Sequence, residues 1–420
     1  MIDRRERFSF AAGDLGFNFV WQSTELYLLF FYITVLGLSP QAAASIFLCG
    51  TVVDLIADPA IGVLVDKSAR RVSVRLWVLL GGPLSGLALA VVFAQPTLAN
   101  VGADGWGFAL VAHVALRISY SMGNIPYGAL TSRISPNPDD HVLLTGARMQ
   151  GAALGGLIAT GIYALLPARG PDGEANFLLG AILLVVLAQP AFLVTYFGVR
   201  ERIAGPLRSS YSTGYLASFA RLIAQSAELR RLLSIVFAAG LSITVVNKSI
   251  MFLFQEINEV RLGYIAALLP SLSLLLTAPL WVAFARRVGC HSVLLAAAAL
   301  NLVAAIGLFV LPPSGLTLVA VVTIAVIAGN GMSMMFWSLA PDIVDRIEHE
   351  EGAEACAARV FASVGISRKL AQALAPQFVT LGLVFSISQT VATGVLIVST
   401  MTFVVIVAYR PAARSVFGRV

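Results

Sequence analysis

Two carboxylates lie four residues apart inside an apolar stretch of the chain, Asp54 and Asp58 in the segment 52–62. Side chains four residues apart project from the same face of an α-helix, so the two charges would lie close together. In surroundings of low dielectric, like charges repel strongly unless a cation neutralises them or one carboxylate keeps its proton. The spacing therefore predicts a cation site, and Pro59 adds a break that frees a backbone carbonyl. The alternative is a salt bridge from these carboxylates to a basic residue on a neighbouring helix.

Polar and aromatic side chains in other apolar stretches are candidates for binding a solute. Asn18, Trp21 and Glu25 follow a spacing of three and then four, which places them on one helical face. Other aromatic residues have polar neighbours at helical spacing: Tyr120, Tyr127 and Trp337. This pattern is typical of a pocket that stacks on one face of a ligand and forms hydrogen bonds with its edge.

Basic residues also interrupt the apolar stretches, where an ionisable group is costly and usually faces a cavity or a partner. Arg148 and Lys369 lie deep within their stretches, and we expect them to bind a ligand rather than only to form structural pairs. Arg117 and Lys248 lie nearer the outer ends of theirs. A long side chain can extend to water from such a position, and we expect these two to do so.

The composition predicts the elements that position these residues. The chain has 420 residues, of which 58% are hydrophobic and 12% charged. Globular chains carry roughly a quarter charged residues, so an ordinary soluble enzyme is excluded and most of the surface should face lipid. A bilayer core about 30 Å thick needs roughly 20 apolar residues per helix. We predict an all-α integral membrane protein whose twelve transmembrane helices lie near 9–36, 40–65, 75–95, 106–131, 142–166, 176–199, 231–255, 261–285, 290–311, 316–343, 357–383 and 388–409.

Lys and Arg gather in alternate connectors, before the first span, at 67–75, at 200–231 and in the tail, whereas 96–105 and 312–315 contain neither. Short cytoplasmic loops carry the excess of such residues, so we predict a multi-pass protein of the cytoplasmic (inner) membrane with both termini in the cytoplasm. The start of the chain does not have the pattern of a removable signal peptide. The basic residues form no single stripe, so no nucleic-acid partner is expected, and we expect a monomer.

One long polar connector, 200–230, divides the chain almost in half. A division into six and six spans is the natural interpretation, because parallel repeats related by an axis along the membrane normal are common in transporters. We predict an N-terminal six-helix bundle over 1–199, a cytoplasmic linker over 200–230 and a C-terminal six-helix bundle over 231–420.

Several motifs occur together in a familiar order: Gly13-Asp-Leu-Gly-Phe-Asn18, Asp54-x-x-x-Asp58-Pro59, Asn124-Ile-Pro-Tyr-Gly-Ala-Leu130 and Ala340-Pro-Asp342-Ile-Val-Asp345. With these motifs, and with Arg148 and Lys369 in their places, the chain resembles the major facilitator superfamily. Within that superfamily it is similar to the glycoside–pentoside–hexuronide:cation symporters of the melibiose-carrier type. The resemblance extends over the whole chain.

The resemblance implies a transporter of the major facilitator fold that works by alternating access between two bundles and needs no cofactor. It implies that Asp54 and Asp58 bind a cation with the help of Ser121. It also implies a substrate site, formed by Asn18, Tyr120, Asn124 and Arg148, with Lys369 across the bundle interface. The cytoplasmic gating residues that it implies are Asp66, Arg70, Arg71, Asp342 and Asp345.

Departures from the family pattern narrow the expected ligands. Melibiose-type members have acidic residues at the positions of Asn18 and Asn124, so a melibiose-like sugar is not expected. They tend to carry an amide at the position of Ala57, and a methyl group cannot coordinate sodium. The site keeps what proton binding needs, which is a buried carboxylate beside a like charge. Protons are therefore favoured as the coupling ion, with Na⁺ at Asp54 and Asp58 as the alternative.

These residues together predict a cation-coupled symporter of an organic solute. Arg148 and Lys369 would face only asparagines, and this surplus positive charge favours an anionic or zwitterionic sugar derivative or lysolipid. The alternative is an exporter of amphiphilic or lipid-like solutes that runs on cation exchange. A membrane-embedded enzyme or sensor is less favoured, because the sequence contains neither a nucleophile motif nor a phosphate-binding loop.

Overall fold

The structure is a computed structural model that describes residues 2–68, 71–98, 105–135, 138–166, 176–202, 221–349, 357–384 and 390–409. Every secondary-structure element within these ranges is a helix. A helix satisfies its own backbone hydrogen bonds, which lipid cannot do, so this architecture suits the apolar composition. The all-α membrane fold predicted from the sequence is confirmed.

The first half of the chain begins with a helical rod in which α and π geometry alternate. Its parts are α1 (Arg4–Gln22), π-helix η1 (Ser23–Tyr27), α2 (Leu28–Phe30) and π-helix η2 (Phe31–Val35). The helices that follow are α3 (Pro40–Ser68), α4 (Val74–Phe93), α5 (Gln95–Leu98), α6 (Trp106–Ile134), α7 (Pro138–Leu165) and α8 (Phe177–Gly198). Those of the second half are α10 (Ala227–Glu256), α11 (Val260–Ala266), α12 (Leu269–Val288), α13 (Cys290–Val310), α14 (Gly315–His349), α15 (Ala357–Val384) and α16 (Thr390–Ala408).

Eight segments of the described chain are long and apolar enough to cross a membrane. They are 40–65, 74–93, 177–198, 227–256, 260–288, 290–310, 315–340 and 391–408. The long helices α1, α6, α7 and α15 are not among them, and these helices carry the charged residues Asp14, Arg117, Arg148 and Lys369. The count of twelve spans stays a prediction.

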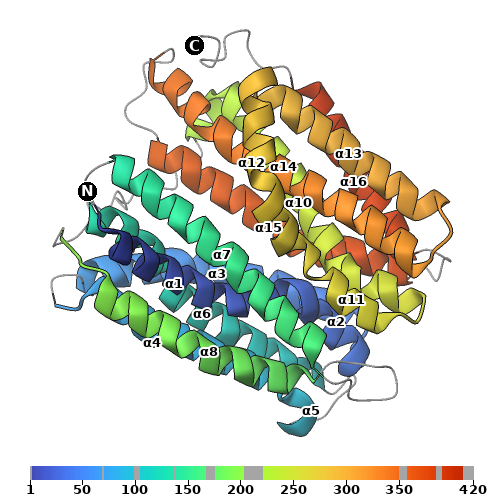
Figure 1. Cartoon of the computed structure of the whole chain (residues 1–420), viewed down its shortest axis with the longest axis horizontal. Helices are drawn as coiled ribbons and strands as arrows, with labels where there is room; N and C mark the ends of the chain where they lie inside the picture. Colours follow the sequence, from blue (N-terminus) through green and yellow to red (C-terminus); the bar gives the residue numbers. More distant parts are fainter. Residues whose placement is uncertain are drawn as a thin grey trace. The chain divides into compact units, whose positions relative to one another are not determined.

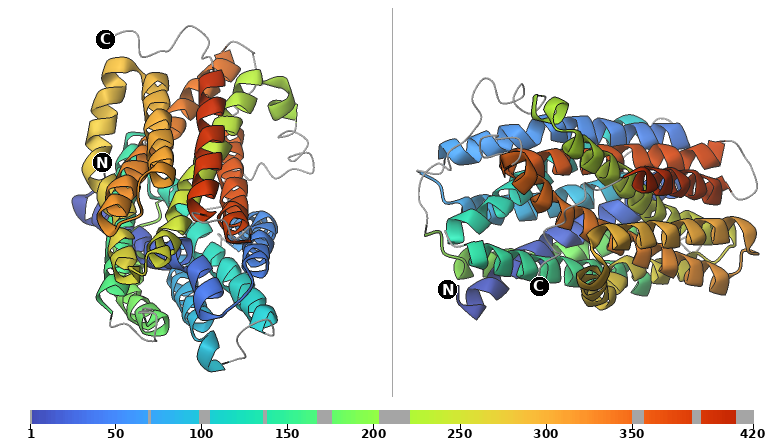
Figure 2. Two further views of the ribbon diagram at one scale, coloured as in Figure 1. Left: turned by 90° about the vertical axis from the view of Figure 1, so that its right-hand side faces the viewer. Right: turned by 90° about the horizontal axis from the view of Figure 1, so that it is seen from above.

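The chain divides into two compact units. Unit 1 comprises Met1–Ser209 with Val260–Ser271, and unit 2 comprises Ser210–Glu259 with Leu272–Val420. Within each unit the helices run side by side, as Figure 1 and Figure 2 show. Residues 203–220 lie outside the described part of the chain, so the linker predicted over 200–230 stays a prediction.

Glycines let two pairs of helices in unit 1 approach closely. A side-chain carbon on Gly81 of α4 would overlap the backbone of Gly123 of α6, and one on Gly151 of α7 would overlap the carbonyl of Ala11 of α1. Helices in lipid pack through such small residues, because no hydrophobic force drives one apolar helix toward another. The close contact of α1 with α7 brings together two charged residues, Asp14 of α1 and Arg148 of α7.

In unit 2 a buried polar cluster joins three helices. The Asn301 amide of α13 donates to Ser242 Oγ of α10 and to Ser399 Oγ of α16, at 2.9 Å in both cases. All three residues are at most 2% exposed. In an apolar medium such hydrogen bonds hold neighbouring helices in one register.

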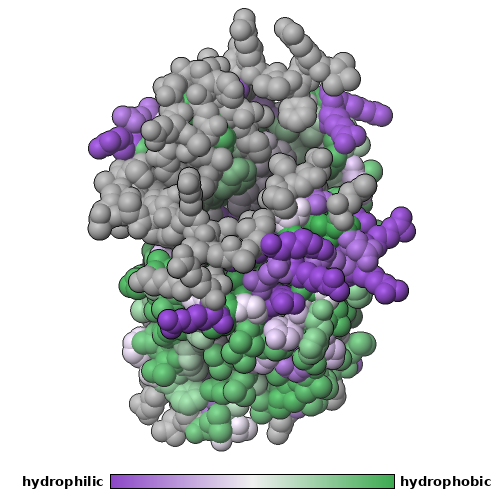
Figure 3. All heavy atoms as spheres, turned by 90° about the vertical axis from the view of Figure 1, so that its left-hand side faces the viewer, coloured by the Kyte–Doolittle hydropathy of each residue, from purple (hydrophilic) through white to green (hydrophobic). Residues whose placement is uncertain are grey.

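The outer faces of the helices carry large apolar side chains that would be a liability in water. Leu280 is 67% exposed and Val310 is 70% exposed, and many residues like them lie on both units. Figure 3 shows hydrophobic side chains over much of the described surface, with hydrophilic side chains gathered in a patch. Contiguous apolar surface of this extent is expected where a protein faces lipid.

Candidate cation and solute site

Helices α3 and α6 pack in parallel with a constant register. Asp54 contacts Arg117 and Asp58 contacts Ser121, and each pair is separated by 63 residues. Both helices repeat every 3.6 residues. Two residues that lie four apart on α3 can therefore contact two residues that lie four apart on α6. The two carboxylates predicted to share a face therefore contact two α6 side chains that are one helical turn apart, Arg117 and Ser121.

Asp54 forms an ion pair with Arg117 through both carboxylate oxygens. Arg117 Nε lies 3.1 Å from Asp54 Oδ1, and Arg117 Nη2 donates to Asp54 Oδ2. Asp54 is 2% exposed, so the pair is well removed from solvent. For Asp54 the salt bridge left open by the sequence is therefore confirmed. Asp58 accepts a hydrogen bond from a hydroxyl, since Ser121 Oγ donates to Asp58 Oδ1 at 2.6 Å.

The expectation that Arg117 and Lys248 extend to water is wrong. The Arg117 guanidinium is held by Asp54, and it also lies over the Trp21 ring at 6.0 Å from the centroid. Lys248 of α10 is 2% exposed within unit 2. The sequence gives the depth of a residue along its helix but not the face on which a neighbouring helix carries a charge, so the pairing of Arg117 with Asp54 could not be predicted.

A second ion pair joins α1 to α7. Arg148 Nε donates to Asp14 Oδ1 at 3.1 Å, and the Asn18 amide donates to Asp14 Oδ2 at 3.3 Å. The Asp14 side chain is 6% exposed, whereas that of Arg148 is 36% exposed. Of the predicted site residues, Asn18 and Arg148 are thus brought together by Asp14. Asp14 was not among the predicted site residues, although its position one turn before Asn18 was a usable signal.

This pair corrects the charge assigned to the pocket. Only asparagines were expected opposite Arg148, but Asp14 forms an ion pair with its guanidinium and compensates its charge. The pair of Asp14 and Arg148 in unit 1 therefore has no net charge, but it offers both guanidinium donors and a carboxylate acceptor. A guanidinium that is 36% exposed still has surface to offer an incoming group.

Aromatic side chains lie beside both pairs. The Trp21 and Tyr120 rings are 5.8 Å apart, and the Asn124 amide donates to the Tyr120 hydroxyl at 3.2 Å. Tyr127 is fully buried, and its hydroxyl donates to the Phe10 carbonyl at 2.6 Å. The Arg148 guanidinium lies 5.3 Å from the Tyr127 ring centroid, so Tyr127 forms a cation–π interaction with Arg148.

Glu25 lies in the π-helical turn η1, where it is 8% exposed. The expectation that it shares a face with Asn18 and Trp21 assumed α-helical geometry. A π-helix has a wider turn, so the periodicity changes at Ser23, before Glu25 is reached. Glu25 is more deeply buried than Asn18 and Trp21, which are both half-buried.

The two remaining predicted substrate residues belong to unit 2. Trp337 of α14 stacks on Phe361 of α15, with centroids 6.4 Å apart and planes 13° apart. Lys369 of α15 is half-buried. Both helices therefore offer polar or aromatic groups within unit 2, and their part in binding stays a prediction.

The predicted gating residues are described only in part. Arg71 is exposed, just after the end of α3. Arg70 and the side chains of Asp66, Asp342 and Asp345 lie outside the described part of the structure. Arg346, next to Asp345, binds the Glu228 carboxylate of α10 at 2.9 Å and 3.0 Å.

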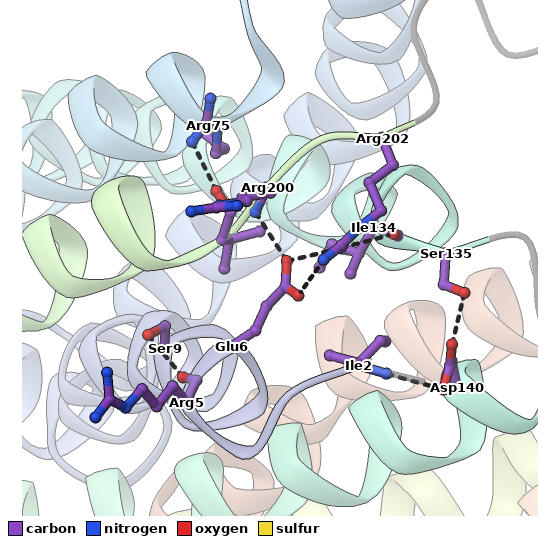
Figure 4. A network of polar contacts seen from close by, with 11 residues as sticks. Ile2, Arg5, Glu6, Ser9, Arg75, Ile134, Ser135, Asp140, Arg200 and Arg202 are labelled. Carbon is purple, nitrogen blue, oxygen red and sulfur yellow. Dashed lines mark hydrogen bonds and ion pairs between the residues drawn. The ribbon is translucent and has the colours of Figure 1, made fainter.

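A polar network fixes the end of α8 to other helices of unit 1 (Figure 4). The Glu6 carboxylate accepts from the Arg200 backbone at 2.9 Å and from the Arg202 guanidinium at 2.9 Å and 2.8 Å. This bond raises the pKa of the Arg202 guanidinium. Glu201 accepts from the backbone N–H of Val74 at 3.2 Å, at the start of α4, where a negative charge is favoured. The first residues after α8 are therefore part of unit 1.

The comparisons with known proteins agree with this architecture. The sequence matches the MFS/sugar transport protein family over residues 9–413. It is 29% identical over 383 residues to "Uncharacterized symporter YnaJ" of Bacillus subtilis, covering 89% of this chain and 81% of that protein. It is 26% identical over 384 residues to "Putative sulfoquinovose importer" of Salmonella typhimurium, covering 89% of this chain and 79% of that protein.

The nucleoside transporter NupG has a similar fold, with a TM-score of 0.67 at 13% sequence identity, covering 97% of this chain and 98% of that chain. The fold and the comparisons together define a multi-pass membrane transporter and not an enzyme. The chain belongs to the MFS/sugar transport protein family, as the sequence resemblance predicted. Several of the proteins that it resembles are named symporters, and cation-coupled symport of an organic solute is the function that fits this family.

Proposed function

We propose that this symporter imports a sugar derivative that carries an acidic group, and that protons drive the import. The observation that carries the proposal is the pair of contacts on neighbouring helices of unit 1, Asp14 with Arg148 and Asp58 with Ser121. The first pair suits a solute with hydroxyl and acidic groups. The second is a carboxylate that accepts a hydrogen bond from a hydroxyl group, and a carboxylate can carry a proton.

The solute chemistry is argued from the side chains around Arg148. Its guanidinium is 36% exposed and can donate to a sulfonate or carboxylate in the bidentate manner that arginine favours. Asp14 and Asn18 supply an acceptor and an amide for sugar hydroxyls. The Trp21 and Tyr120 rings offer an apolar face for the C–H face of a sugar ring. The similarity to a sulfoquinovose importer favours the same class of solute.

The ion is argued from the oxygens that remain near the carboxylates. Both oxygens of Asp54 bind Arg117, so a metal ion would have to compete with the guanidinium for them, and Ala57 contributes no side-chain oxygen. A hard metal cation needs several oxygen ligands at set distances. A proton needs one carboxylate, so the arrangement favours H⁺ over Na⁺.

Coupling then follows from the cost of removing a charge from water. A carrier with Asp58 ionised resists the occluded state, because that state takes the carboxylate out of water. A proton on Asp58 removes the charge, after which solute binding favours occlusion. By linkage, the solute must strengthen proton binding by the same factor by which the proton strengthens solute binding.

We propose in addition that the protein works as a monomer in the cytoplasmic membrane, with both termini in the cytoplasm and without a cofactor. The orientation is supported by the Lys and Arg residues at 67–75 and 200–231, since basic residues favour the cytoplasmic side. Placement in the inner membrane is supported by the apolar helices, because outer-membrane proteins span as barrels.

The proposed solute class is tested by thermal stability of the purified protein with sulfoquinovose and with glucose, a matched sugar without the sulfonate. We expect sulfoquinovose to raise the melting temperature and glucose to leave it nearly unchanged. Arg148→Gln should abolish the difference between the two sugars. Stabilisation by glucose alone would contradict the acidic group. Counterflow in vesicles of both orientations separates import from the exporter alternative.

A further inference from the structure

The proposed function uses Arg117 only as the group that occupies the oxygens of Asp54, and the charge of its guanidinium carries a further consequence. Arg117 lies on α6 one turn before Ser121, opposite Asp54, and its side chain is 18% exposed. A guanidinium remains charged at any physiological pH. The pair of carboxylates that the sequence identifies as a cation site therefore already holds one positive charge, supplied by the chain itself.

The geometry resembles ligation of an ion by Asp54. The guanidinium engages both carboxylate oxygens, with Nε at 3.1 Å from Oδ1 and Nη2 donating to Oδ2. The guanidinium also lies over the ring of Trp21 of α1, at 6.0 Å from the ring centroid. A metal ion at Asp54 would have to displace this group from its carboxylate and from its aromatic partner.

We propose that Arg117 is a resident counter-cation that replaces a metal ion at Asp54 and so determines the ion selectivity of the symporter. This inference deepens the proposed function and rests on it for its biological meaning. The effect on cation binding does not depend on which solute is transported. The guanidinium neutralises Asp54, occupies both of its oxygens and repels a second cation. A site built in this way rejects Na⁺ by an unfavourable contact as well as by missing ligands.

The inference predicts a gain of sodium binding when the charge is removed. Arg117→Ala leaves Asp54 and Asp58 as two carboxylates on one helical face, the arrangement that a cation relieves. We expect replacement of choline chloride by sodium chloride at equal ionic strength to raise the melting temperature of this variant by about 2–5 °C. The unaltered protein should show no shift. Bound ²²Na⁺ should appear in the variant only.

Two matched variants separate the charge from the packing of the side chain. Arg117→Lys keeps the positive charge and should remain insensitive to sodium. Arg117→Ala combined with Asp54→Asn removes both charges and should fold without responding to sodium. If Arg117→Ala is too unstable to purify, Arg117→Gln keeps most of the shape without the charge and takes its place.

A sodium response in the unaltered protein, equal to that of Arg117→Ala, would overturn the inference. The absence of a response in both Arg117→Ala and Arg117→Gln would also overturn it. The probe is sodium alone, so a wrong solute class leaves this result unaffected. Conversely, proton-driven uptake by the unaltered protein together with sodium-insensitive variants would overturn this inference and leave the proposed function intact.

Discussion

The ion pair between Asp14 and Arg148 predicts that its two partners differ in what their loss costs. Exposed ion pairs contribute about 0–1 kcal/mol, whereas breaking a fully buried pair costs about 3–5 kcal/mol. The Asp14 side chain is 6% exposed and that of Arg148 is 36% exposed, so the pair lies between these limits. The side chain that is left behind decides the cost of each substitution.

Arg148→Gln leaves a buried carboxylate without its counter-charge, and we expect it to lower the free energy of unfolding by about 3 kcal/mol. Asp14→Asn leaves a guanidinium that still reaches water, and we expect a loss of about 1.5 kcal/mol. The double variant should lose less than the sum by about 1 kcal/mol, because each single variant already breaks the shared contact.

The measurement is unfolding in mixed detergent micelles by titration with SDS, followed by circular dichroism. Gln41→Ala, at an exposed residue in the first turn of α3, serves as a control that should leave stability unchanged. A larger loss for Asp14→Asn than for Arg148→Gln would refute the reasoning from exposure. Strict additivity in the double variant would refute the pair itself.

Three other substitutions test separate parts of the structure. Asp58→Asn should abolish uphill accumulation of sulfoquinovose in proteoliposomes but permit equilibrative counterflow, and full accumulation would contradict the coupling role. Lys369→Ala should lower uptake at least tenfold with little loss of melting temperature, and unchanged uptake would leave Lys369 a structural residue. Glu6→Gln should lower the free energy of unfolding by about 1 kcal/mol, since the Arg202 side chain that it binds is 48% exposed. High salt should weaken the unaltered protein toward the level of Glu6→Gln, and a salt-independent difference would show that the charge is not responsible.

The sequence identified the membrane fold because long apolar segments with few charges can bury their surface in lipid only as helices that satisfy their own backbone hydrogen bonds. It also identified the helical face of Asp54 and Asp58, since a spacing of four within one helix fixes that geometry. It left open whether a basic neighbour would bind them. The structure shows that Arg117 binds Asp54 and that Ser121 donates to Asp58.

The partners themselves could not be predicted, for a physical reason. Contact between helices depends on their relative register, and the 63-residue offset between α3 and α6 has no signature in either helix alone. The same holds for Asp14 and Arg148, which meet because glycines on α7 let α1 approach. The π-helical turn at Ser23–Tyr27 could not be predicted either, since the local composition does not distinguish it from an α-helical turn.

Proton-coupled uptake is tested most directly by transport of sulfoquinovose into proteoliposomes under one gradient at a time. An inward pH gradient without sodium should drive accumulation, and the alkalinisation of the medium should match the solute taken up in a fixed ratio. An inward sodium gradient at equal pH on both sides should drive none. Accumulation that follows sodium and ignores the pH gradient would contradict the assignment of the proton as the coupling ion.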